Sequence, residues 1–189
     1  MSLFELYLRL GFKHIIDING YDHIVFILAL CATYSYTHFK KILILVTAFT
    51  IGHSITLALA TLKLVTISSH LIEFLIPVTI LITAFSNLFS SNFKNRLIYV
   101  VTLFFGLIHG LGFSNYLKEL LGKESNILTP LLAFNIGLEI GQILIVLVNF
   151  LILFIATTIF KVNHKNWKTF ISGMAFGIAA ILILENKVW

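Results

Sequence analysis

Residues 45–62 read LVTAFTIGHSITLALATL, an almost unbroken apolar run that carries His53 among hydroxyl-bearing residues. A bilayer core about 30 Å thick needs about 20 apolar residues per helix, so this run has the length and composition of a transmembrane helix. The rest of the chain has the same character, because 59% of its 189 residues are hydrophobic, 11% are charged and the mean hydropathy is +1.00. These values lie outside the usual range of soluble domains and predict an integral membrane protein.

Further apolar runs of similar length predict an all-α transmembrane helix bundle with about six spans in a single domain, residues 1–189. Before the first span, Glu5, Arg9 and Lys13 are spaced four residues apart, with apolar residues on another face. This pattern predicts a short amphipathic helix in the membrane interface. The expected spans are residues 21–38, 41–62, 70–89, 96–116, 129–160 and 169–185.

The charged residues and the single cysteine exclude several classes of protein. Cys31 has no partner for an internal disulfide and cannot build a thiolate metal cage. The isoelectric point near 9.4 is not taken as a sign of nucleic-acid binding, since basic residues in membrane proteins usually report topology. Seven lysines and arginines fall in the first, third and fifth loops against six on the other side, which places both termini outside the cytoplasm.

Six ionisable side chains stand within or at the edges of the predicted spans. Each costs about 2.5 to 3.5 kcal/mol at a helix centre on insertion scales, so such groups normally pair with one another or line a pathway. Counting about 1.5 Å of rise per residue along each span places all of them in the outer half of the membrane or near its midplane. We therefore predict one shared site formed by Asp22, His23, His53, Glu73, His109 and Glu139.

Other polar residues share helix faces with these groups and are predicted to support the site. Thr50 and Ser54 lie on the stripe of His53. Asn135 and Gln142 follow the spacing of Glu139 on another helix. His14 precedes the first span, and the pattern leaves open whether it is solvated or folds over the site as a lid. Three further histidines at loop edges are interpreted as surface residues: His38, His70 and His164.

Imidazoles and carboxylates in a dry pocket suit three kinds of chemistry. They bind first-row divalent cations such as nickel, cobalt or zinc. They also relay protons across membranes. Three histidines and one acid, moreover, match the ligand count of a hydrolytic zinc site in which a separate carboxylate acts as general base. The chain lacks the HExxH signature of zinc proteases, and a structural role for single histidines or for the glycine pairs also stays open.

Five segments of the chain carry the polar residues described above: GYDHIVFILAL (20–30), LVTAFTIGHSITLALATL (45–62), LIEFLIP (71–77), FFGLIHGLGF (104–113) and FNIGLEIGQ (134–142). In this order they resemble the HupE/UreJ family of membrane proteins associated with hydrogenase and urease maturation, in particular its second branch. The resemblance implies a bundle of six to seven helices in the bacterial inner membrane and a role in transporting nickel or a related metal ion. It also implies that the six ionisable residues above occupy the motif positions of the family.

The preferred interpretation is a multi-pass metal-ion permease or metal-handling protein, with no catalytic residue assigned. Its partners would be the lipid bilayer and the divalent ion, without nucleic acid, and a homo-oligomer or accessory subunits stay open. The alternative is an intramembrane zinc hydrolase. It would bind zinc through His23, His53 and His109 and would use Thr50 or Ser54 to position its substrate.

Overall fold

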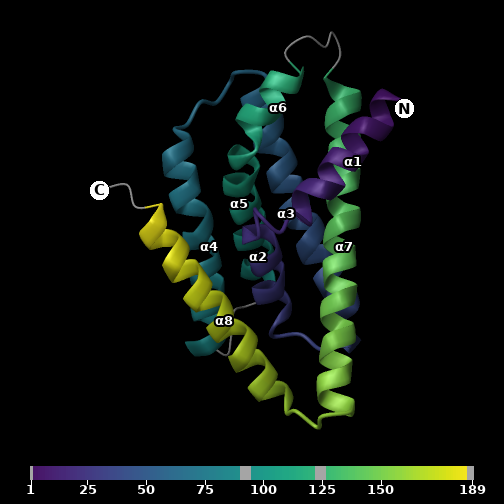
Figure 1. Cartoon of the computed structure of the whole chain (residues 1–189), viewed down its shortest axis with the longest axis vertical. Coiled ribbons are helices and arrows are strands. Elements are labelled where there is room, and N and C mark those ends of the chain that lie inside the picture. Colours follow the sequence, from purple (N-terminus) through teal and green to yellow (C-terminus); the bar gives the residue numbers. More distant parts are fainter. Residues whose placement is uncertain (1, 90–94, 122–126, 187–189) are drawn as a thin grey trace.

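A computed structural model describes residues 2–89, 95–121 and 127–186. In this part of the chain the structure is all-α, with eight α-helices, one short 3₁₀-helix and no strand (Figure 1). The helices are α1 (Leu3–Ile15), α2 (Asp22–Cys31), α3 (Phe39–Thr61), α4 (Ser69–Phe89), α5 (Asn95–Gly112), α6 (Ser114–Leu121), α7 (Leu128–Thr158) and α8 (His164–Glu185), and the 3₁₀-helix η1 is Tyr36–His38.

Four helices are long and apolar enough to cross a membrane: α3, α4, α7 and α8. Many of their large apolar side chains are exposed, as lipid contact would require, among them Leu144, Leu147 and Leu151 of α7. These helices match four of the predicted spans within a few residues. With 31 residues, α7 has a length of about 46 Å, which exceeds a bilayer core. The structure is therefore that of a multi-pass membrane protein.

The first predicted span, residues 21–38, is wrong as a single helix. Helix α2 has only ten residues and ends at Cys31, so it is too short to cross a bilayer alone. The chain turns after it, since the Tyr34 amide donates to the Cys31 carbonyl and the Ser35 hydroxyl lies 2.6 Å from that of Thr37. These local hydrogen bonds compete with continuation of the helix.

The fourth predicted span, residues 96–116, also ends early. Helix α5 stops at Gly112, and α6 begins as a separate helix at Ser114. The apolar part of α5 that could enter a membrane is correspondingly short, Leu97–Gly112. The described residues therefore contain four long and two shorter apolar helices in place of six full spans. The basic residues used to predict topology include Lys94, Lys123 and Lys187, which lie outside the described residues.

Glycines allow two pairs of helices to approach with their backbones in contact. A Cβ atom on Gly106 would lie 2.2 Å from the Phe49 carbonyl oxygen, so α5 packs directly on α3. A Cβ on Gly137 would lie 1.9 Å from the Leu8 carbonyl oxygen, which brings α1 equally close to α7. The amphipathic helix α1 is thus a packed element of the bundle. The glycine pair of α8 differs, because nothing lies within 4 Å of a Cβ on Gly173 or Gly177.

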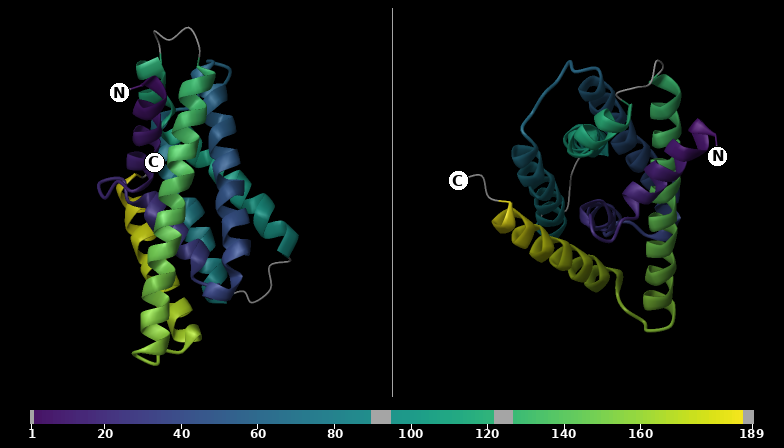
Figure 2. Two further views of the ribbon diagram at one scale, coloured as in Figure 1. Left: turned by 90° about the vertical axis from the view of Figure 1, so that its right-hand side faces the viewer. Right: turned by 45° about the horizontal axis from the view of Figure 1, so that its top comes forward.

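Helix α2 lies inside the bundle, with the longer helices arranged around it (Figure 2). Most of its residues are buried, and its most extensive contacts are with α4, α7 and α8. The chain reaches α2 from the end of α1 through residues 16–21, so a short break separates two helices that both point toward the bundle centre (Figure 1). This break places the end of α1 and the start of α2 beside the middle of α3 and the end of α5.

Candidate metal centre

Four histidine rings meet where these helices converge. His14 comes from the last turn of α1, His23 from the first turn of α2, His53 from α3 and His109 from α5. The His23 ring lies at the centre, with its centroid 4.8 Å from that of His14, 6.0 Å from that of His53 and 5.0 Å from that of His109. We call these four residues the His cluster. His53 and His109 are fully buried and His23 is 4% exposed.

The atoms of the cluster form two overlapping groups that could hold a metal ion. One group contains His14, His23 and His53, and the other contains Asp22, His23 and His109. In each group one nitrogen or oxygen per residue lies within 4.8 Å of the others. His23 belongs to both groups and therefore links them.

Asp22 fixes the orientation of the His23 ring. The Asp22 carboxylate Oδ1 accepts hydrogen bonds from the His23 backbone amide at 2.7 Å and from the His23 ring Nδ1 at 2.9 Å. Because an ionised carboxylate only accepts, the ring proton sits on Nδ1 and leaves a lone pair on Nε2. This Nε2 atom is buried without a hydrogen-bond partner among the described residues. A carboxylate that fixes the tautomer of a ligating histidine is a recurring feature of metal centres.

Thr79 of α4 orients His109 in a similar way. Its hydroxyl lies 2.7 Å from the Ile76 carbonyl oxygen and 2.9 Å from His109 Nε2. A hydroxyl has one proton, and when the carbonyl takes it, His109 Nε2–H donates to the Thr79 oxygen. The lone pair of His109 then lies on Nδ1, which is buried without a partner in the described part of the chain.

The other two histidines also carry unpartnered nitrogens. Both ring nitrogens of His53 and the Nε2 atom of His14 are buried without a hydrogen-bond partner among the described residues. Leaving a buried polar group unsatisfied costs about 1 to 3 kcal/mol, so such groups require an explanation. A cation bound to their lone pairs would supply one. Burial, with a smaller contribution from His23, lowers the pKa of His14 to about 3, which keeps this ring neutral and able to bind a cation.

Aromatic side chains surround much of the cluster. The Phe113 ring centroid lies 4.1 Å from that of His14, and the Phe49 and Phe26 centroids lie 5.0 and 5.2 Å from that of His109. Phe134 stacks against His53 at 6.3 Å. Such an apolar shell controls solvent access and strengthens interactions between a cation and its ligands.

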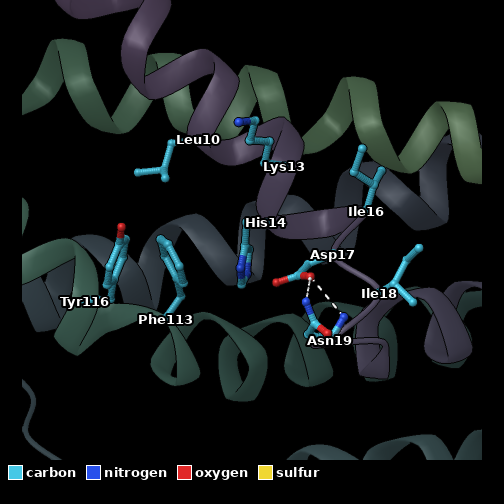
Figure 3. Close-up of a pocket in the computed structure, with 9 residues that line it drawn as sticks. All are labelled: Leu10, Lys13, His14, Ile16, Asp17, Ile18, Asn19, Phe113 and Tyr116. Carbon is cyan, nitrogen blue, oxygen red and sulfur yellow. Dashed lines mark hydrogen bonds between the residues drawn. The ribbon is translucent and has the colours of Figure 1, made fainter.

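Two cavities lie beside the cluster at the connection between α1 and α2. The larger, of about 560 Å³, is lined by His14, Lys13, Asp17, Asn19 and Tyr116 among others (Figure 3). Asp17 points into it and accepts hydrogen bonds from the backbone and side chain of Asn19. The smaller cavity, of about 170 Å³, is lined by both Asp22 and Glu73. The large cavity gives His14 direct access to the surroundings.

The predicted site residues divide into those that meet and those that lie apart. Four of the six predicted ligands lie close together: Asp22, His23, His53 and His109. Glu73 is exposed on α4 and outside both ligand groups. Glu139 is also outside them and accepts a hydrogen bond from Thr47 at 2.6 Å. A role for either acid as a ligand stays a prediction.

One pair of the predicted supporting residues joins α3 to α7 beside the cluster. The Thr50 hydroxyl donates to Gln142 Oε1 at 2.7 Å, so the two predicted polar stripes face each other. Ser54 donates to the Thr50 carbonyl within α3, and Asn135 donates to the Leu131 carbonyl within α7. The loop-edge residues His38 and His70 are exposed, and His164 is half-buried at the start of α8.

Sequence reasoning treated His14 only as a supporting residue and did not identify Thr79. The close approach of α1 to α7, which places His14, depends on glycines far apart in the chain. Thr79 follows Pro77 by two residues in an apolar helix, and a hydroxyl next to a helical proline was the available signal.

The fold and the cluster define a multi-pass helical membrane protein with a buried His cluster that could hold a metal ion. Comparison with known families agrees with this class, since a family model described as "HupE / UreJ protein" matches residues 1–186. The chain belongs to the HupE/UreJ family. No curated protein and no solved structure matches the chain.

Proposed function

We propose that the protein is a permease for a divalent first-row metal ion, with nickel as the expected substrate. The observation that carries the proposal is the His cluster, in which four imidazoles and one carboxylate converge inside a membrane bundle. Imidazole suits nickel, cobalt and zinc, and the cluster lacks the thiolate or thioether ligands that select cuprous copper. The association of the family with nickel handling supports nickel among these ions.

The arrangement of the cluster suits movement of an ion better than permanent retention. Transport requires binding that is strong enough for entry and weak enough for release, often at several adjacent positions. The two groups that share His23 offer two such positions. The break between α1 and α2 adds to this, because interrupted helices commonly form the ion sites of membrane transporters.

Uptake of Ni²⁺ into proteoliposomes tests the proposal. Wild-type protein should support uptake, and His109→Ala should abolish it while the protein remains folded, because one group loses its imidazole. His70→Ala is the matched control, since His70 is exposed and outside the cluster. Equal Ni²⁺ uptake by wild type and His109→Ala would refute the assignment.

The zinc hydrolase alternative requires a carboxylate that can accept a proton from a metal-bound water. In the described ligand groups that carboxylate is Asp22, whose Oδ1 atom already accepts two hydrogen bonds from His23. This favours an orienting role for Asp22 and supports transport over hydrolysis. Tightly held, stoichiometric zinc that survives dialysis against a chelator would reverse that preference.

A further inference from the structure

A third cavity lies between α2, α4 and α5, on the other side of the His cluster from His14. Its volume is about 60 Å³, which is room for a few water molecules. Half of its lining residues are polar, which is unusual for the interior of an apolar bundle. We call this cavity the hydroxyl pocket, after its polar lining residues Thr33, Thr83, Ser86, Asn87 and Thr102.

All three helices place the His cluster between the hydroxyl pocket and the other cavities. On α5 the order is Thr102 in the pocket, His109 in the cluster and then Phe113, which lines the large cavity just after the helix. On α4, Thr83 lines the pocket and Thr79 contacts His109.

Helix α2 shows the same order. It begins with Asp22 and His23 at the cluster, and Leu30 near its end lines the hydroxyl pocket. Seven residues of helix separate His23 from Leu30, a distance of about 10 Å along the axis. The three helices therefore agree that cavities lie at two opposite sides of the cluster.

Two phenylalanines separate the cluster from the hydroxyl pocket. The Phe26 ring is 1% exposed, and its centroid lies 5.2 Å from that of His109 and 6.1 Å from that of Phe105. Phe105 in turn lines the pocket. An apolar constriction of this kind stops a hydrated ion, because the ion cannot shed its water there.

We propose that the hydroxyl pocket is the second mouth of the metal-ion path, and that Phe26 and Phe105 form the barrier that closes it. The inference rests on the proposed transport function. In the described conformation the His cluster is open toward the cavity at His14 and closed toward the pocket. When the barrier opens, hydroxyl and amide oxygens of the pocket receive the cation from the histidines. They are weaker ligands for nickel than imidazole, so the ion leaves readily.

Cysteine labelling in proteoliposomes tests the path. In a Cys31→Ala background, Ser86→Cys places a thiol in the hydroxyl pocket and Asn19→Cys places one in the large cavity. A membrane-impermeant cationic methanethiosulfonate reagent should label these two variants from opposite sides of the membrane. Labelling of Ser86→Cys should stop Ni²⁺ flux. Phe85→Cys is the matched control, because Phe85 is adjacent, 53% exposed and outside the pocket lining.

Equilibrium binding of Ni²⁺ in detergent separates failure of the path from failure of the function. Labelled Ser86→Cys should retain the wild-type Ni²⁺ affinity while it loses flux. The path is overturned if Ser86→Cys stays unlabelled, if both thiols react from the same side, or if flux continues after labelling. It is equally overturned if labelled Phe85→Cys loses flux to the same extent. Absence of both binding and flux in the wild type would instead overturn the proposed function.

Discussion

A single proton decides which nitrogen of His109 can bind a cation. The Thr79 hydroxyl lies between the Ile76 carbonyl and His109 Nε2, and donation to the carbonyl leaves the lone pair of His109 on Nδ1. Asp22 has the same effect on His23 through a carboxylate. Thr79 and Asp22 therefore determine which nitrogen of His109 and of His23 is free to bind a cation.

Replacing Thr79 should weaken metal binding without removing a ligand. Thr79→Val keeps the shape of the side chain and loses the hydroxyl, so the Ni²⁺ affinity should fall by roughly 10- to 100-fold, as for other groups that orient metal ligands. Thr79→Ser should restore it. Thr157→Val is the control, because the Thr157 hydroxyl donates only to backbone carbonyls of its own helix, α7, and Thr157 belongs to neither ligand group. Titration calorimetry measures the affinities, and equal values for Thr79→Val and wild type would contradict the assigned tautomer.

His14 should act as a ligand rather than only as a lid. Its removal in His14→Ala takes one imidazole from a ligand group, so the Ni²⁺ affinity should fall by more than the roughly 10- to 100-fold expected for an orienting residue. Equilibrium dialysis against Ni²⁺ measures this change. An affinity that is unchanged while Ni²⁺ flux changes would assign His14 to access instead.

At the scale of elements, the docking of α1 on α7 controls whether the cluster is complete. A Cβ at position 137 would lie 1.9 Å from the Leu8 carbonyl, so Gly137→Ala must move α1 away from α7. Overpacking of this kind typically costs about 1 to 3 kcal/mol of stability. His14 at the end of α1 would move with the helix.

Gly137→Ala should therefore lower the Ni²⁺ affinity as His14→Ala does, and the double variant should show no further loss. Gly173→Ala should leave the affinity unchanged and should not lower the thermal stability, since nothing lies within 4 Å of that Cβ and alanine favours the helix. Calorimetry and thermal unfolding in detergent report the two quantities. Additive losses in the double variant would show that α1 affects the site by some other route.

The same contacts explain what sequence could predict. Apolar length alone predicted α3, α4, α7 and α8. Counting residues along the predicted spans placed six ionisable side chains at similar depth, and four of them lie close together in the structure, whereas Glu73 and Glu139 lie outside the ligand groups. The end of α2 was missed because hydrogen bonds near Ser35 compete with the helix although its surroundings are apolar. The place of His14 was missed because it depends on a backbone contact between segments more than 120 residues apart.

For the whole molecule, the direction of transport depends on which end faces the cytoplasm. The basic residues of the odd-numbered loops predict termini outside the cytoplasm. An alkaline phosphatase fused to the C-terminus should then be active in cells. A fluorescent protein fused at the same position should be dark, because it would be exported unfolded through the Sec pathway. The reverse pattern would place the cavity at His14 on the cytoplasmic side, and the hydroxyl pocket outside.

Both the proposed transport function and the proposed ion path require that the His cluster binds a divalent metal ion. The most direct test is Ni²⁺ binding by purified protein in mild detergent, with wild type, His53→Ala and His38→Ala compared side by side. His38 is exposed and outside the cluster, so it controls for adventitious binding to surface imidazoles. We predict reversible binding by wild type and His38→Ala that is strongly weakened in His53→Ala, because one of the two ligand groups loses an imidazole. Equal binding by all three proteins, or none by the wild type, would contradict the claim.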